Sequence, residues 1–357
     1  MEIQGGVKIR REDRIPAKNE ISRPGRPWLD ERGLSRYAYG LERIAQFPRN
    51  GMAVLVVRHV TTYRYKRPVR LGEHRLMFRP RDSFDQRLLH SHLAIVPQPS
   101  RLRWIHDVFG NCVTLFDFDT SSTLLEVASI IQLEHTPERA PDFQIEEYAK
   151  LHPFEYHPEQ LPDLSSCIER QLPDPDREVI TWLGRFLSPG QRQPTGRLLM
   201  TLNEAIADGF SYSRRIAPGT QRPVETLRLR SGTCRDFALL MMEAARAMGF
   251  AARFVTGYIY VPHRDHPGWL GEGATHAWCQ IYLPGSGWVE FDPTNGIVGN
   301  RDLIRVAVTR NPDQAIPLSG VYWGDREDEL GMDVQVNVRS GTILSSIDLP
   351  AGAESFE

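Results

Sequence analysis

Three residues in the second half of the chain have side chains that can catalyse acyl transfer: Cys234, His276 and Asp292. A cysteine thiolate attacks carbonyl carbons, a histidine can hold and return a proton, and a carboxylate can orient the histidine ring. Such a set would open an amide through a thioester. Water resolves the thioester by hydrolysis and an amine resolves it by transamidation, and these three residue types do not distinguish the two outcomes.

Cys234 lies at the predicted start of a helix. Apolar residues follow it at the i, i+3, i+4 and i+7 spacing of a buried helical face: Phe237, Leu240, Met241, Ala244, Ala245 and Met248. Thr233 or Ser231 can cap the first turn, and Gly249 can end the last one. Unpaired backbone N–H groups and the helix dipole would stabilise a thiolate there. A small buried residue would also suit this position, so the turn alone leaves both roles open.

His276 and Asp292 lie on two predicted strands, 275–283 and 287–292, that the turn 284–286 joins as a hairpin. A plain four-residue loop would place the two side chains on opposite faces of the sheet. We therefore predict an irregularity between Ile281 and Asp292, or at Asp292 itself, that turns the carboxylate toward His276, through a β-bulge, a longer loop or a strand that ends at Pro293.

Asn295 is the alternative partner for His276. If the strands paired regularly and Asp292 pointed away from the imidazole, Asn295 would become the residue that orients the ring. The site would then be a Cys-His-Asn set of the kind that papain-like proteases use.

Four sequence pieces resemble the transglutaminase-like superfamily, a branch of the papain-like cysteine enzymes. They are Gly232-Thr233-Cys234-Arg235-Asp236, Arg253-Phe254-Val255-Thr256-Gly257-Tyr258, His276-Ala277-Trp278 and Gly287-Trp288-Val289-Glu290-Phe291-Asp292-Pro293-Thr294-Asn295. The resemblance implies an α+β, papain-like core in which a helix with an N-terminal cysteine packs on an antiparallel sheet. It also implies a Cys234, His276, Asp292 triad, with hydrolysis favoured over cross-linking. By family position, Tyr212 would join the Cys234 N–H in stabilising the oxyanion.

A run of short strands precedes this core. The segments 54–65, 74–79, 87–96, 102–107, 112–118 and 123–133 are β-branched or alternating. They predict an antiparallel β-domain, built as a sandwich. Tyr63-Arg64-Tyr65 and Arg79-Pro80-Arg81 resemble the N-terminal domain that accompanies the catalytic core in bacterial transglutaminase-like proteins.

Composition shifts divide the chain into five parts. They are a disordered extension (1–51), the β-domain (52–138), a proline-punctuated linker (139–175), the catalytic domain (176–345) and a tail (346–357). Met52 directly precedes the first strand, so translation could start there or at Met1.

Overall composition narrows the class of partner. The 357 residues carry a formal net charge of −2, which gives no electrostatic reason to expect nucleic acid or a membrane as partner. The expected partner is a peptide, protein or small amide substrate, and the oligomeric state stays open. Four scattered cysteines and the lack of a signal-like N-terminus favour a cytoplasmic protein with reduced thiols. No cofactor is expected, since no carboxylate-rich calcium loop is evident.

Two further hypotheses remain. His263 and His266, with His276 and Cys279, have the spacing of a zinc set. Alternation along the strand would, however, point His276 and Cys279 to opposite faces, which leaves core packing as the expected role of Cys279. The fold could also serve as a binding or assembly module with an idle site. A Cys234→Ser protein that kept its cellular role would favour that module.

Overall fold

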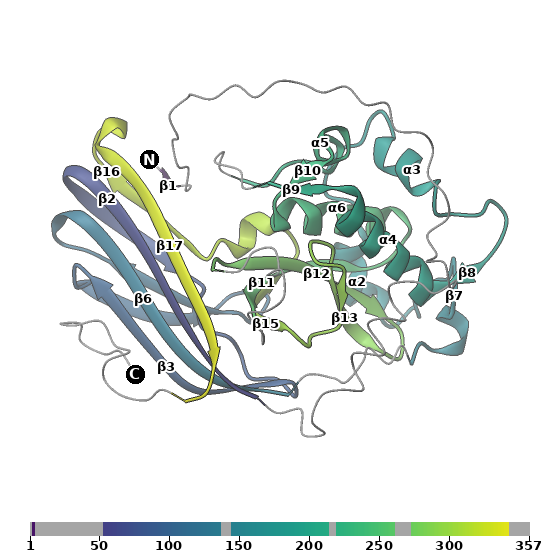
Figure 1. Cartoon of the computed structure of the whole chain (residues 1–357), viewed down its shortest axis with the longest axis horizontal. Helices are drawn as coiled ribbons and strands as arrows, with labels where there is room; N and C mark the ends of the chain where they lie inside the picture. The colour runs from purple at the N-terminus through teal and green to yellow at the C-terminus, as the bar shows by residue number, and fades with distance from the viewer. Residues whose placement is uncertain (1, 4–52, 137–143, 214–218, 261–272, 343–357) are drawn as a thin grey trace, which may run out of the picture.

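The protein has an α+β fold of two parts, a curved sheet of long strands and a helix-covered smaller sheet (Figure 1). The computed structural model describes residues 2–3, 53–136, 144–213, 219–260 and 273–342. The predicted α+β class, with an antiparallel β-domain before a helix-on-sheet core, is confirmed. Within these ranges, no helix has the length and apolar character needed to cross a membrane.

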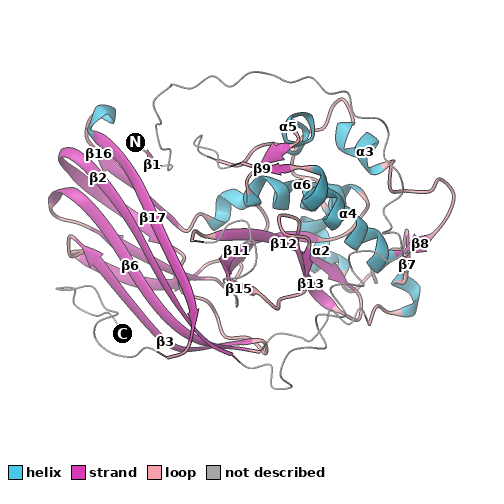
Figure 2. Cartoon of the chain, in the orientation of Figure 1, coloured by secondary structure: helices cyan, strands magenta, loops and turns pink. Residues whose placement is uncertain are grey.

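The first part is a single eight-stranded antiparallel sheet that curves into a half-barrel (Figure 2). Its strands are β1 (Glu2–Ile3), β2 (Ala53–Leu76), β3 (Gln86–Val96), β4 (Arg101–His106), β5 (Cys112–Asp117), β6 (Ser121–His135), β16 (Leu318–Trp323) and β17 (Glu329–Ser340). The predicted sandwich is therefore wrong. Strand β2 runs for 24 residues through the centre of the sheet and pairs with four other strands along its length. Alternation in the sequence does not reveal that two predicted strands are one.

Strands β16 and β17 revise the predicted domain boundaries. Both lie within 176–345, yet both pair with β2 of the half-barrel, with Val334 opposite Thr61 near the middle of the longer ladder. The half-barrel thus includes strands from both ends of the chain. An alternating pattern identifies a strand, but it does not identify the partner on which the strand packs.

The predicted disordered extension, 1–51, lies almost wholly outside the described residues. Its described part, Glu2–Ile3, pairs with Gly320 and Val321 at the edge of the half-barrel.

A chain that starts at Met52 is expected to fold, because it loses a two-residue ladder and none of the buried core among the described residues. Its melting temperature, measured by calorimetry, should stay within about 4 °C of the full chain, the shift that roughly 1 kcal/mol produces. A fall of about 10 °C or more would show that residues 1–51 pack on the domain.

The second part is a five-stranded antiparallel sheet with helices on one face (Figure 1). Its strands, in spatial order, are β14 (Ile297–Val298), β13 (Gly287–Asp292), β12 (His276–Leu283), β11 (Ala252–Ile259) and β15 (Leu303–Thr309). The central helix α6 (Cys234–Ala247) packs on β11 and β12 through a fully apolar stripe that includes Phe237, Leu240 and Met241. This burial supplies the main stabilisation of the core.

Other helices and short strand pairs surround α6. They are α2 (Leu161–Ile168), α3 (Glu178–Leu183), α4 (Thr195–Gly209), α5 (Pro223–Leu229) and the small pairs β7 (Leu151–His152) with β8 (Gln193–Pro194) and β9 (Ser211–Tyr212) with β10 (Ser231–Gly232). The described part of the linker packs against the core. Its Tyr156 hydroxyl donates to the Tyr282 carbonyl at 2.9 Å and accepts the Ala251 N–H at 2.9 Å.

Gly257 allows β11 and β15 to approach closely beside the site. It faces His276 in the β11–β12 ladder and lies where the β11–β15 register shifts. A Cβ at this position would lie 2.0 Å from the Ile304 carbonyl oxygen, a backbone atom that cannot move aside alone.

Gly257→Ala is therefore expected to lower the free energy of unfolding by about 1–3 kcal/mol, the usual cost of overpacking, or by more. Urea titration measures this change. Gly209→Ala is the matched control, since its Cβ would meet nothing within 4 Å. Equal stability of the two variants would contradict the close approach at Gly257.

Candidate active site

The start of α6 is held by a reciprocal cap. The Asp236 carboxylate accepts the Thr233 backbone N–H at 2.8 Å and the Thr233 hydroxyl at 2.9 Å. It also accepts the Gln221 N–H at 2.6 Å. Gly232 lies directly against this cap, because a Cβ there would be 2.9 Å from the Asp236 Cβ. The first turn of α6, which carries Cys234, is thus held in place by the contacts of Asp236 with Thr233, Gln221 and Gly232.

Cys234 lies in this first turn and is 7% exposed. Free backbone N–H groups and the positive end of the helix dipole favour negative charge at this position. The predicted location of the thiol at a helix start is present in the structure.

His276 and Asp292 form a buried pair. The His276 Nε2 and Asp292 Oδ2 atoms are 2.8 Å apart, and both side chains are inaccessible to solvent. Asp292 also accepts the Asn295 side-chain amide at 2.8 Å and the Thr294 backbone N–H at 2.9 Å. Asp292 is therefore the residue that orients the imidazole, and Asn295 orients Asp292 instead of replacing it.

The second ring nitrogen of His276 is the one available to Cys234. Because Asp292 occupies Nε2, the nitrogen available to the Cys234 thiol is Nδ1, which is buried and has no other hydrogen-bond partner among the described residues. The structure thus brings Cys234, His276 and Asp292 together in that order.

The electrostatics of the pair favour a charged imidazolium. Burial by itself would lower the pKa of His276, but the charge and hydrogen bond of Asp292, with a further contribution from Cys234, raise it from 6.5 to about 10. Burial would likewise raise the pKa of Asp292, but the positive His276 and the surrounding donors hold it below its ordinary value. Near neutral pH, the ring is a proton donor with a fixed orientation.

The hairpin reaches this geometry with regular pairing between its strands, so the departure from the plain four-residue loop, predicted between Ile281 and Asp292, lies in the turn, which is shorter and not longer than that loop. The ladder runs without a shift from Leu283–Gly287 to Cys279–Phe291. The turn closes over three residues, 284–286, with the Ser286 N–H donating to the Leu283 carbonyl at 3.0 Å. One residue fewer in the loop changes the facing of every later side chain, which puts His276 and Asp292 on the same face.

A polar network behind His276 was not foreseen from the sequence. The Trp278 ring stacks near the His276 ring, with centroids 5.9 Å apart at 27°. The Trp278 Nε1–H donates to Glu290 Oε2 at 2.6 Å, and Glu290 Oε1 accepts from Gln280 and Arg305, each at 2.6 Å. Alternation places Trp278 and Gln280 on one strand face, but their approach to Glu290 depends on the hairpin register, which the sequence does not define.

Four other residues had a predicted role, and the structure describes two of them, Tyr212 and Cys279. Tyr212 pairs with Gly232 in the β9–β10 ladder, two residues before Cys234, and its role as an oxyanion donor stays a prediction. Cys279 is fully buried in the core that packs under α6, as predicted. His263 and His266 lie outside the described residues. Within the described ranges, no group of three or more His, Cys, Asp or Glu side chains could hold a metal ion.

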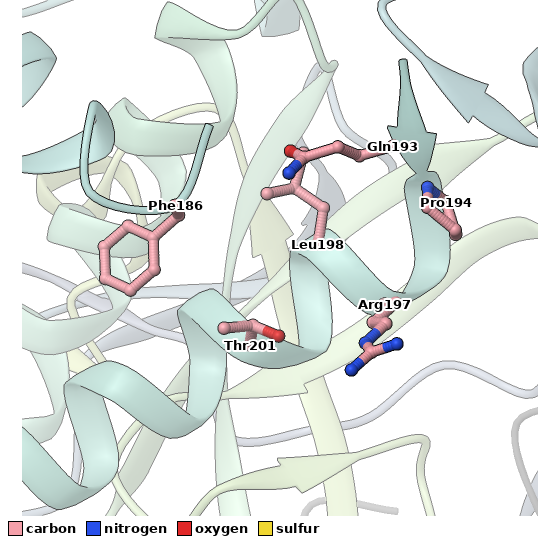
Figure 3. Close-up of a pocket in the computed structure, with 6 residues that line it drawn as sticks. All are labelled: Phe186, Gln193, Pro194, Arg197, Leu198 and Thr201. Atoms are coloured by element: carbon pink, nitrogen blue, oxygen red, sulfur yellow. The ribbon is translucent and has the colours of Figure 1, made fainter. Parts of the chain in front are cut away.

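A cavity of about 290 Å³ lies beside α4. Figure 3 shows Leu198 and Thr201 on that helix, with Phe186 across from them. None of the three candidate side chains lines it. This cavity is therefore not part of the thiol site.

The helix-borne thiol and the strand-borne His–Asp pair define a papain-like arrangement, and comparison with known proteins narrows it. Residues 55–134 match the bacterial transglutaminase-like N-terminal region, and residues 186–293 match the transglutaminase-like superfamily core. The chain therefore carries a bacterial transglutaminase-like N-terminal region followed by a transglutaminase-like superfamily core, as the sequence motifs indicated.

Similar proteins occur in mycobacteria. An uncharacterized protein of Mycobacterium tuberculosis is 29% identical over 304 residues, which are 82% of this chain and 94% of the relative. An uncharacterized protein of Mycobacterium leprae is 26% identical over 307 residues, covering 78% and 96%. A solved structure from Cytophaga hutchinsonii, of a proposed cysteine protease, shares the fold with a TM-score of 0.58 at 17% identity, over 82% of this chain and 93% of that one.

Proposed function

We propose that this protein is a cysteine hydrolase that cleaves an amide or peptide bond through Cys234, His276 and Asp292. The observation that carries the proposal is the position of His276. One ring nitrogen is fixed by Asp292 at 2.8 Å, and the other is left to the thiol at the helix start. A cysteine sulfur beside the protonated nitrogen of an oriented imidazole provides a nucleophile and a proton donor.

The chemistry proceeds in two stages. The Cys234 thiolate attacks the carbonyl carbon, and the C–N bond breaks as His276 Nδ1–H gives its proton to the leaving nitrogen. The product is a thioester on Cys234 and a free amine. His276, now neutral, takes a proton from water as the water oxygen attacks the thioester. The C–S bond breaks, the carboxylic acid leaves, and the thiolate–imidazolium pair is restored.

Two groups would stabilise the oxyanion of each tetrahedral intermediate. The Cys234 backbone N–H is at the first position of α6, where it has no partner within the helix. Tyr212, on the strand beside the cysteine turn, would supply the second donor. We favour hydrolysis over transamidation because water needs no acceptor site of its own.

The test is to incubate the full chain with a peptide-based electrophilic thiol probe, and then with peptide libraries with and without an added alkylamine. Mass spectrometry of the products should show free carboxylic acids in both conditions. Cys234→Ala should lose probe labelling and turnover, whereas Cys279→Ala, which removes a buried thiol elsewhere in the core, should retain them. Exclusive formation of the alkylamide would replace hydrolysis with transamidation. A protein that binds peptides but never turns them over would be a binding module.

A further inference from the structure

A second, larger cavity lies on the face of the core sheet that turns away from α6. Its volume is about 680 Å³, and it lies between the segment 81–86, which follows β2, and the turn and strand 285–290 of the core. Strand alternation places Arg253 and Gln280 on this face, because their neighbours Phe254 and Cys279 belong to the apolar cluster under α6. The volume is that of a small-molecule site, and such sites often form where two structural parts meet.

One arginine in the wall, Arg305, is already paired with two carboxylates. Arg305 donates to Asp85 at 2.8 Å and to Glu290 at 2.6 Å, so that a single guanidinium joins the half-barrel to the core. Glu290 receives further hydrogen bonds from Trp278 and Gln280. These groups form a closed structural network and do not call for a ligand.

Arg253, unlike Arg305, is not paired with a carboxylate in the described part of the chain. Its guanidinium lies 3.9 Å from the centre of the Trp288 ring, and its Nε donates to Gln280 Oε1 at 2.7 Å. Within the described part of the chain, no hydrogen bond or ion pair is made by Nη1 or Nη2. Burial lowers the pKa of Arg253 to about 10, with Glu290 acting in the opposite direction. The stacking and the Nε bond fix the guanidinium, and Arg253 is one of the residues that line the cavity.

A hydroxyl in the same wall is also unsatisfied. Ser286 lines the cavity, and its Oγ is buried without a hydrogen-bond partner. Because that Oγ atom is enclosed by the protein, it does not face the cavity, and of the two residues only Arg253 offers donors to a bound group.

We propose that this cavity is a binding site for a small carboxylate-bearing molecule, whose carboxylate accepts from the Nη1 and Nη2 edge of Arg253. The planar fork of an arginine matches a carboxylate in two parallel hydrogen bonds. The lining carries three arginines, Arg81, Arg253 and Arg305, and three carboxylates, Asp82, Asp85 and Glu290, so its charges balance and a single negative charge is favoured over a phosphate dianion. The remaining volume accommodates an organic group.

This site does not depend on the proposed hydrolase. Neither Cys234 nor His276 nor Asp292 lines the cavity. Ligand binding should therefore be unchanged in a Cys234→Ala protein, whether or not that thiol is a nucleophile.

The experiment is a calorimetric titration of the full chain with glutarate, benzoate and N-acetylglycine, with phosphate and chloride as comparisons at matched ionic strength. At least one carboxylate should bind saturably with a Kd below about 1 mM, an ordinary affinity for a small ligand, and phosphate should bind at least tenfold more weakly. Arg253→Gln and Arg253→Lys should each weaken carboxylate binding at least tenfold. Arg185→Gln, which removes an exposed positive charge beyond α3, should leave it unchanged.

Saturable binding that Arg253→Gln leaves intact would overturn the proposal, and so would the absence of carboxylate binding at 10 mM. Hydrogen exchange on the wild-type chain keeps the test decisive if an Arg253 variant fails to fold. Saturating carboxylate should protect amides in 81–86 and 285–290. Protection confined to the start of α6, or no protection at all, would count against the cavity.

Discussion

Iodoacetamide at pH 6 is expected to alkylate Cys234 before Cys112, Cys167 and Cys279. Because Cys234 lies at a helix start beside the His276 imidazole, its sulfur is expected to react faster than thiols outside such a site, with a rate advantage on the order of 10²-fold. Burial raises the pKa of Cys112, and burial raises the pKa of Cys279 well above its ordinary value.

Peptide mass spectrometry over a time course measures the four rates in one sample. Cys234→Ser should remove the fast phase, and His276→Ala should slow it toward the rate of an ordinary thiol. Cys167 serves as the internal reference, because it is partly exposed and makes no side-chain hydrogen bond among the described residues. First labelling at Cys279, with Cys234 inert, would remove Cys234 as the nucleophile.

Replacing Asp292 should cost both stability and activity. Asp292→Ala leaves the buried His276 ring without its counter-charge, and removing one partner of a buried ion pair typically costs about 3–5 kcal/mol of unfolding free energy. Asp292→Asn should be milder for folding yet lower turnover by about 10²–10⁴-fold, because the ring loses its orienting carboxylate. Asn295→Ala is the matched control, since it removes one of the hydrogen bonds to Asp292 and keeps the pair. Wild-type turnover in Asp292→Asn would exclude the proposed orienting role.

The pair also predicts how stability depends on pH. The pKa of His276 is raised to about 10, so its contribution is complete below the ordinary value of 6.5 and is lost as pH rises through 10. The pKa of Asp292 is lowered, so its contribution is present above the ordinary value of 3.8 and is lost as pH falls below it. Urea titrations between pH 7 and pH 10 should show the wild-type chain losing its advantage over Asp292→Ala. A constant difference over that range would contradict the raised pKa.

The three candidate side chains could be predicted from sequence because local patterns carry them. A capped apolar periodicity places Cys234 at a helix start, and the motifs around His276 and Asp292 have a characteristic order. The hairpin register could not be predicted, since it depends on whether the turn closes over three residues or four. That choice depends on Gly285 and Gly287, which both adopt positive φ angles of 88° and 72°.

The pairings between strands far apart in the chain could not be predicted from the sequence. The alternation in β17 indicates a strand, but nothing local says that it pairs with Thr61 and its neighbours more than 270 residues earlier. The network through Trp278, Glu290 and Arg305 was missed for the same reason. Arg305 reaches Glu290 and Asp85 only after the core sheet and the half-barrel have met.

The ladder between β2 and β17 has a consequence for the order in which a newly made chain can fold. Strand β2 emerges early from the ribosome, but its β17 partner is among the last described residues to be synthesised. Until then, a long stretch of β2 presents an open edge, which is a template for pairing with other chains. The core strands and α6 are complete earlier, so this part can fold while the half-barrel still waits for its last strand. Ribosome-bound chains halted just after residue 310 has left the exit tunnel should accordingly contain a protease-resistant core and a protease-sensitive β2, and chaperones that shield open sheet edges should bind them in preference to the finished protein.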